Sequence, residues 1–124
     1  GLREGVKKVI AGGPMMGIAV STVDLPITKT ASALLCLMED EAAAYEETTC
    51  IRCGKCAQVC PSHIIPQKMM DAAEKHDLAM FQYLNGMECC ECGCCTYACP
   101  ARRPLTQAFK QMRQAVMAER RKKG

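Results

Sequence analysis

The sequence predicts a mainly α-helical chain of 124 residues with a short β-rich segment at its start. Two observations lead to this fold class. Short apolar runs separated by Gly and Pro fill residues 1–38, and apolar residues recur at helical spacing between about residues 66 and 116. Three short strands are too few to build a core of their own. Residues 1–38 are therefore expected to be the end of a larger domain.

The β-rich segment contains three apolar runs. Residues 6–10 lead to Gly12-Gly13-Pro14, a strong break, and residues 16–20 form a second run. The run at 33–38 predicts a buried strand. The stretch 12–17 lacks the G-x-G-x-x-G spacing of a dinucleotide-binding loop, so a structural turn is favoured there.

Helical patterns occupy most of the remaining chain. Residues 39–47 are acidic and alanine-rich, which favours a helix within a linker at 39–49. Pro66 suits the first turn of a helix over 67–75. A shorter helix is expected over 77–84, ending at Asn85-Gly86.

Apolar side chains mark the inner faces of these helices. Ile65, Met69 and Ala73 lie four apart on the helix over 67–75. The last helix follows Pro104, and its stripe comprises Leu105, Phe109, Met112 and Val116. The methionines are expected to fill the core rather than bind metal. Residues 50–124 are thus predicted to form one domain.

Two cysteine runs dominate the chemistry of the sequence. Residues 50–61 and 89–100 both read C-x2-C-x2-C-x3-C-P, and each cysteine of the second run lies 39 positions after its counterpart. This is the run typical of bacterial [4Fe–4S] ligation, in which the fourth cysteine binds the other cluster. Gly54 and Gly93 supply the bend in each loop, where a positive φ is easiest without a Cβ.

The repeat predicts two [4Fe–4S] clusters with one exchanged ligand each. The first cluster is assigned to Cys50, Cys53, Cys56 and Cys99. The second cluster is assigned to Cys89, Cys92, Cys95 and Cys60.

Other uses of the cysteines are weaker fits. The odd count of 11 and the loop spacing argue against a disulfide scaffold. Structural zinc needs only two C-x-x-C pairs per ion and leaves the third step of three unexplained. Cys36, Cys90 and Cys94 fall outside both registers and are expected to be small, partly buried thiols.

The positive charges are concentrated near the C-terminal end. Residues 101–124 hold eight of the 16 Lys and Arg residues and one acidic residue, Glu119. With no Trp, three Tyr and two Phe, the chain offers little for base stacking, so nucleic acid is not expected as a partner. The basic end is either a solvated helix end or a docking surface for an acidic partner or an anionic membrane. His63 and His76 are expected on the surface.

The motifs together resemble a known family. Residues 50–67 and 89–104 resemble the dicluster ferredoxin domain of RnfC, the peripheral redox component of the Rnf electron transport complex. Gly-Gly-Pro-Met-Met-Gly at 12–17 and Pro-Ile-Thr-Lys at 26–29 resemble the SLBB domain that precedes it in that family. The chain departs from the family at 30–33, where Thr-Ala-Ser-Ala replaces a turn with two glycines.

The resemblance implies a fold and a setting. It implies an α-helical dicluster ferredoxin domain preceded by a β-rich remnant of an SLBB, β-grasp-like domain. Members are peripheral subunits on the cytoplasmic side of a bacterial membrane complex that couples ferredoxin–NAD exchange to Na⁺ or H⁺ transport. Partners would be other subunits of the complex and a soluble ferredoxin. FMN and NADH are expected only on an absent N-terminal part.

The function expected is single-electron relay, with no substrate bond made or broken by these residues. Arg52 and Lys55 lie in the first loop and Glu91 in the second, which predicts a higher reduction potential for the first cluster. The alternatives are the electron-relay domain of a cobalamin-reducing flavoprotein of microcompartments (PduS type) and, from another class, a zinc-stabilised interaction module.

Overall fold

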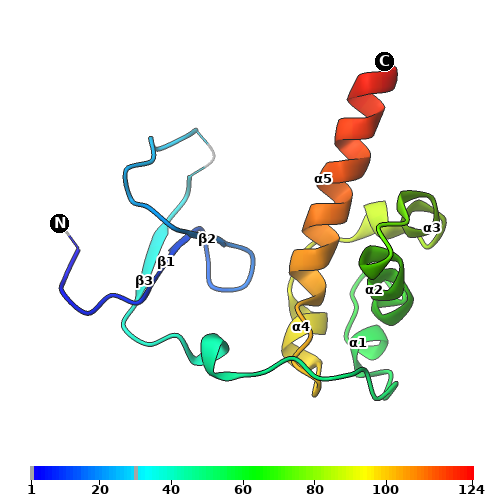
Figure 1. Cartoon of the computed structure of the whole chain (residues 1–124), viewed down its shortest axis with the longest axis horizontal. Coiled ribbons are helices and arrows are strands. Elements are labelled where there is room, and N and C mark those ends of the chain that lie inside the picture. The colour runs from blue at the N-terminus through cyan, green and yellow to red at the C-terminus, as the bar shows by residue number, and fades with distance from the viewer. Residues whose placement is uncertain (1, 30) are drawn as a thin grey trace. The chain divides into compact units, whose positions relative to one another are not determined.

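The computed structural model describes residues 2–29 and 31–124 and divides into two compact units, Gly1–Glu46 and Glu47–Gly124 (Figure 1). Thr30, where the sequence departs from the resembled family, lies outside the described residues. The first unit contains β1 (Lys8–Ala11), β2 (Ile18–Val20), β3 (Leu34–Leu37) and the 3-10 helix η1 (Glu41–Ala44). The second contains α1 (Lys55–Gln58), α2 (Pro66–Glu74), α3 (Leu78–Tyr83), the 3-10 helix η2 (Gly86–Glu88), α4 (Cys94–Ala98) and α5 (Leu105–Lys123). The predicted class, mainly α with a short β part, is confirmed.

The first unit is a three-stranded antiparallel sheet with the order β2-β1-β3. Ile10 on β1 lies opposite Ala19 on one side and Leu35 on the other. The connection from β1 to β2 is a tight turn, because a Cβ on Gly17 would lie 2.5 Å from the carbonyl oxygen of Gly13. Residues 12–17 therefore form the predicted structural turn.

Two expectations for this unit are wrong. The side chains of β3 are not buried, and Leu34 is 59% exposed, because β3 is an edge strand and the central strand β1 carries the buried Val9 and Ile10. The helix expected over 39–47 is reduced to η1. Isolated helices this short are marginal in water, and the exposed side chains described in η1 offer no packing face.

The second unit has its core between α2, α3 and α5. Phe81 and Phe109 are fully buried, and their ring centroids lie 6.2 Å apart. The predicted stripe on the last helix is confirmed, since Leu105, Phe109, Met112 and Val116 are all buried. Asp77 caps α3 by accepting a 2.9 Å hydrogen bond from the backbone N–H of Met80. This core supports the cysteine loops from one side, because buried Cys95 belongs to the same cluster of side chains.

The inner face of α2 differs from the expected one at one position. Met69 and Ala73 are buried as predicted, but Ile65 is 45% exposed. Ile65 is the N-cap, with φ −107° and ψ 88°, so its side chain does not follow the helical face. Met69, Met70 and Met112 are buried, which confirms methionine as core filler.

The 39-residue repeat extends from the cysteines to the backbone. The short helices α1 and α4 both begin after a glycine in the left-handed region, and α2 and α5 begin 39 residues apart. Three pairs of residues 39 positions apart have positive φ: Arg52 and Glu91 (55° and 57°), Gly54 and Gly93 (75° and 83°), and His63 and Arg102 (51° and 55°). The two halves therefore share a conformation as well as a motif.

Gly86→Ala is expected to destabilise the second unit. A Cβ at this position would lie 2.5 Å from the ring of Phe81, which is fully buried and has no room to move. Overpacking of this kind costs about 1–3 kcal/mol. The measurement is anoxic thermal unfolding in a double-mutant cycle with Phe81→Leu. The double variant should lose less stability than the two single losses added together, and strict additivity would contradict the steric cause.

Within the part of the chain that the structure describes, no helix is both long enough and apolar enough to cross a bilayer.

Candidate metal centres

The first cysteine loop encloses a cavity of about 310 Å³. Ile51, Arg52 and Gly54 line it from the loop itself, Gln67 from α2, and Pro100 and Ala101 from the far end of the second motif. The cysteines that line it are Cys50, Cys53, Cys56 and Cys99. Three come from the first motif and one from the second.

The second cysteine loop encloses another cavity of about 310 Å³. Pro61 and Ser62 line it from the end of the first motif, and Thr106 and Phe109 line it from α5. Its lining includes the four cysteines Cys60, Cys89, Cys92 and Cys95, with Cys90 as a fifth. The structure thus brings together all eight cysteines assigned from the sequence, in the two groups in which they were assigned.

The shape of each group fits an iron–sulfur cluster better than a single ion. A zinc ion draws four thiolates to about 2.3 Å from one point. Among residues 2–29 and 31–124, no three His, Cys, Asp or Glu side chains lie close enough to share one metal ion. Each set of four cysteines instead surrounds a hollow, as it must if iron and sulfide are to fill the space between the thiolates.

Burial shapes the chemistry of the thiols. It raises the pKa of Cys56, Cys89 and Cys95 above the ordinary value for cysteine. Hydrogen bonding from Thr106 opposes this rise of the pKa at Cys95, where the hydroxyl lies 3.7 Å from the sulfur. Because a thiol must lose its proton to bind metal, positively charged iron would supply the compensation that the buried thiolates need.

A pair of threonines holds α5 against the second loop. The hydroxyls of Thr96 and Thr106 lie 2.8 Å apart, and the backbone N–H of Thr106 donates to Thr96 at 2.9 Å. In the first loop, the backbone N–H of Arg52 lies 3.4 Å from the sulfur of Cys50 and donates to it. These contacts place N–H and O–H donors beside the sulfurs, and such donors are one of the means by which proteins tune cluster potentials.

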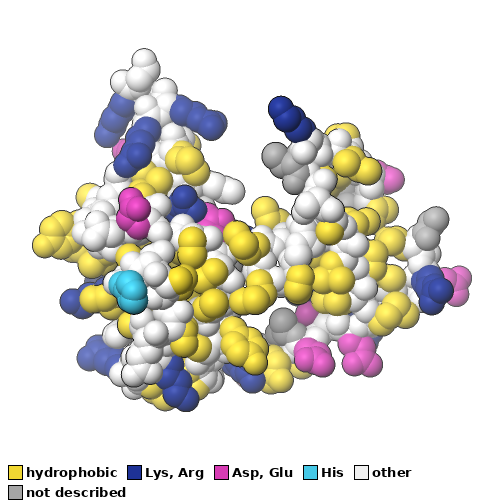
Figure 2. All heavy atoms as spheres, turned by 180° about the vertical axis from the view of Figure 1, so that it is seen from behind, with side chains coloured by type: hydrophobic (Ala, Val, Ile, Leu, Met, Phe, Trp, Pro, Cys, Tyr) yellow, Lys and Arg dark blue, Asp and Glu magenta, His cyan; other side chains and the backbone are white. Residues whose placement is uncertain are grey.

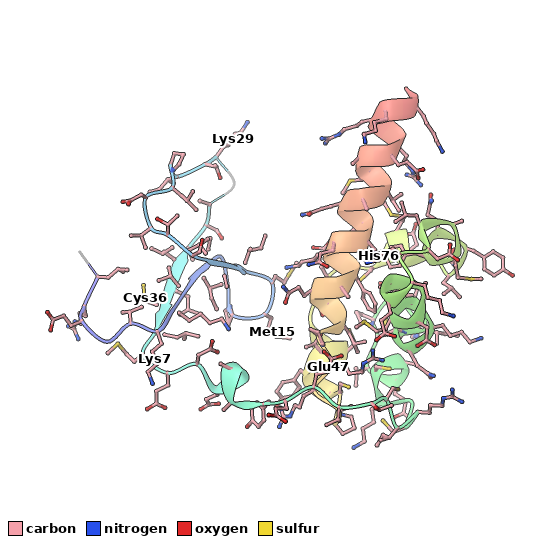
Figure 3. The ribbon with its side chains drawn as sticks, viewed as in Figure 1. Lys7, Met15, Lys29, Cys36, Glu47 and His76 are labelled. Carbon is pink, nitrogen blue, oxygen red and sulfur yellow. The ribbon has the colours of Figure 1, made fainter. Side chains whose placement is uncertain are left out.

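A buried arginine fastens the entry to the first loop. Arg103 is 7% exposed, donates from Nε to Glu47 at 3.2 Å, and forms an ion pair with Glu74 on α2. The backbone N–H of Thr48 donates to the carbonyl of Ala101 at 3.0 Å. Glu47, labelled in Figure 3, is thereby held three residues before Cys50.

The two loops differ in exposure and in charge. In the first loop Cys53 is exposed, Ile51 is 68% exposed, and neither Arg52 nor Lys55 has an ion-pair partner among the described residues. In the second loop Glu91 forms an ion pair with Arg113 of α5. The charge contrast used to predict the order of potentials is therefore altered by a residue outside both loops.

The remaining cysteines and the histidines are peripheral to the two groups. Cys36 on β3 (Figure 3) and Cys90 are exposed rather than partly buried, while Cys94 is half-buried as expected. Cys90 nonetheless lines the second cavity. His63 and His76 are exposed, which confirms their surface placement.

Sequence reasoning missed several contacts around the cavities. The pairs that involve Arg103 and Arg113 link residues far apart in the chain and leave no local pattern. Gln67 and Thr106, however, line the first and second cavity respectively and lie 39 positions apart. Extending the repeat beyond the cysteines would have found them.

Comparison with known proteins defines the class first. Residues 43–102 match a family model described as a 4Fe-4S dicluster domain. The chain is therefore an iron–sulfur protein of the dicluster type.

The relatives are more specific, and each of them is the C component of a redox complex. That of the Na(+)-translocating ferredoxin:NAD(+) oxidoreductase complex of Acetobacterium woodii is 39% identical over 115 residues, which are 93% of this chain and 26% of the relative. That of the ion-translocating oxidoreductase complex of Buchnera aphidicola is 31% identical over 86% of this chain and 23% of the relative. That of the proton-translocating ferredoxin:NAD(+) oxidoreductase complex of Clostridium ljungdahlii is 41% identical over 60% of this chain and 16% of the relative. By sequence, the chain belongs to this RnfC family and spans about a quarter of the length of these relatives or less.

Proposed function

We propose that this chain is the electron-transfer module of an ion-translocating ferredoxin:NAD(+) oxidoreductase complex. The observation that carries the proposal is the pair of cavities, each lined by three cysteines of one motif and one of the other. Two [4Fe–4S] clusters would supply one-electron oxidation and reduction there. The exchanged cysteines keep the two sites adjacent, which favours transfer between them.

The residues of this chain have distinct tasks in the proposal. The eight thiolates hold the clusters, and the N–H of Arg52 and the hydroxyl of Thr106 donate to their sulfurs. Buried Phe109 excludes water from the inner wall of the second cavity. Exposed Cys53 leaves the first site open at the surface. The first site is therefore the one that a redox partner approaches more closely.

The setting of the module follows from its relatives and is part of the proposal. Other subunits of the complex, and a soluble ferredoxin, would exchange electrons with it, while FMN and NADH would bind to sequence not contained in this chain. Figure 2 shows Lys and Arg side chains gathered where α5 ends, at Arg120, Arg121, Lys122 and Lys123. Such a basic end supports a peripheral position near acidic proteins or the anionic cytoplasmic face of the membrane.

Anaerobic metal analysis tests the function directly. The expected result is about eight iron and eight acid-labile sulfide per chain, with a brown colour that dithionite bleaches and an EPR signal on reduction. The same preparation should contain no stoichiometric zinc. A colourless protein carrying zinc would refute the redox function and favour an interaction module.

A further inference from the structure

We propose that Arg113 on α5 sets the reduction potential of the second cluster and makes it the more easily reduced of the two. This inference rests on the proposed function, because it concerns a property of the bound cluster. It reverses the order of potentials that the loop residues alone predict. The reason is that the second site has a partly buried cation, whereas the cations of the first loop are exposed.

The position of Arg113 on α5 directs it to the second site. Thr106 and Phe109, which line the second cavity, lie seven and four residues before it and therefore share its face of the helix. Its side chain is 24% exposed and forms an ion pair with Glu91 in the second cysteine loop. Arg113 thus contacts the loop that holds three of the four cysteines.

One nitrogen of Arg113 lacks a partner. Its Nε is buried from solvent and makes no hydrogen bond to any described residue. Buried N–H groups are nearly always paired, and an arginine N–H that is left unpaired is costly. Sulfurs of the second cluster are acceptors of the right kind for this group, because N–H···S bonds to cluster sulfurs are a common feature of such sites.

The charge of Arg113 acts on a cysteine of the second site. It favours the thiolate form of Cys89, against the larger opposing effect of burial on the same pKa. Glu91, the ion-pair partner, acts on Cys89 through a backbone hydrogen bond that also favours the thiolate. The positive end of the ion pair is therefore the end that Cys89 senses electrostatically. A reduced cluster carries one more negative charge than an oxidised one, so this cation favours reduction.

The internal repeat provides a matched comparison. The residue 39 positions before Arg113 is Glu74, at the end of α2, and it pairs with Arg103. The first half thus has an acid where the second half has Arg113. Its cations, Arg52 and Lys55, are exposed, and water and salt screen exposed charges more strongly than buried ones.

The test is a redox titration of the whole chain, monitored by EPR, with both clusters assembled. Arg113→Gln should lower one of the two midpoint potentials by a tenfold change in the reduction equilibrium, about 59 mV for one electron. The double variant Arg52→Gln/Lys55→Gln should move the other potential, and by less. Arg121→Gln, on the exposed end of the same helix, should move neither.

The outcomes separate this inference from the proposed function. Unchanged potentials in an Arg113→Gln variant that retains about eight iron would overturn the role of Arg113, as would equal shifts of both potentials. If Arg113→Gln fails to assemble, Arg113→Lys keeps the charge but not the Nε–H. A lowered second potential in that variant supports the proposal, and a wild-type potential overturns the part played by the N–H. Absence of iron from the wild-type chain would instead refute the proposed function.

Discussion

Cys99→Ser is expected to remove the cluster of the first loop, although Cys99 belongs to the second motif. Cys99 lines the first cavity together with Cys50, Cys53 and Cys56, so its loss leaves that site with three thiolates. The second site keeps all four of its cysteines. Anaerobic analysis should find about four of the eight iron atoms remaining, and EPR should find a single reducible cluster.

The exchange can be tested from both sides. Cys60→Ser should remove the cluster of the second loop, because Cys60 lines the second cavity. Cys94→Ser and Cys90→Ser serve as controls and should leave both clusters assembled, since neither is among the eight assigned ligands. If Cys99→Ser instead spared the first-loop cluster and destroyed the other, the exchanged ligation would be wrong.

Phe109→Ala is expected to produce the largest loss of stability from a single core substitution. Phe109 is fully buried, contacts the ring of Phe81 and also forms part of the wall of the second cavity. Removing a buried Phe side chain costs about 3–5 kcal/mol. Anoxic thermal unfolding should therefore shift by more than about 10 °C in a unit of this size.

The position of Phe109 also predicts a selective effect on one cluster. Water admitted at the cavity wall should speed the loss of the second cluster in air relative to the first, measured by EPR over time. Val116→Ala is the control, because Val116 lies on the same buried stripe but does not line the cavity. It should lower stability without changing the relative rates. Equal acceleration for both clusters in Phe109→Ala would contradict this interpretation.

The sequence predicted the helical core and the grouping of the cysteines for local reasons. The stripe on α5 follows from the helical period, and the cysteine spacing repeats in register, so each half is defined by a short window. The positive φ at Gly54 and Gly93 was likewise expected from the absence of a Cβ. The same conformation at Arg52 and Glu91 was not expected, because it depends on the loop closing around its site rather than on residue type.

What the sequence did not predict depends on contacts between distant segments. Arg103 and Glu47 are 56 positions apart, and Arg113 and Glu91 are 22 apart, so no periodic pattern links them. The burial of β3 was overestimated because an apolar run does not reveal whether a strand lies at the edge of its sheet. Ile65 was misplaced because its spacing fits the helix while its backbone precedes it.

The cysteine that each half contributes to the other has an evolutionary consequence. A polypeptide containing a single half would have three cysteines around its own hollow and a fourth turned toward a neighbour. Two identical copies related by a two-fold axis would complete both sites at once. A homodimeric ancestor, joined into one chain by gene duplication, accounts for a 39-residue periodicity that persists in the left-handed positions at His63 and Arg102, beyond the last cysteine of each run.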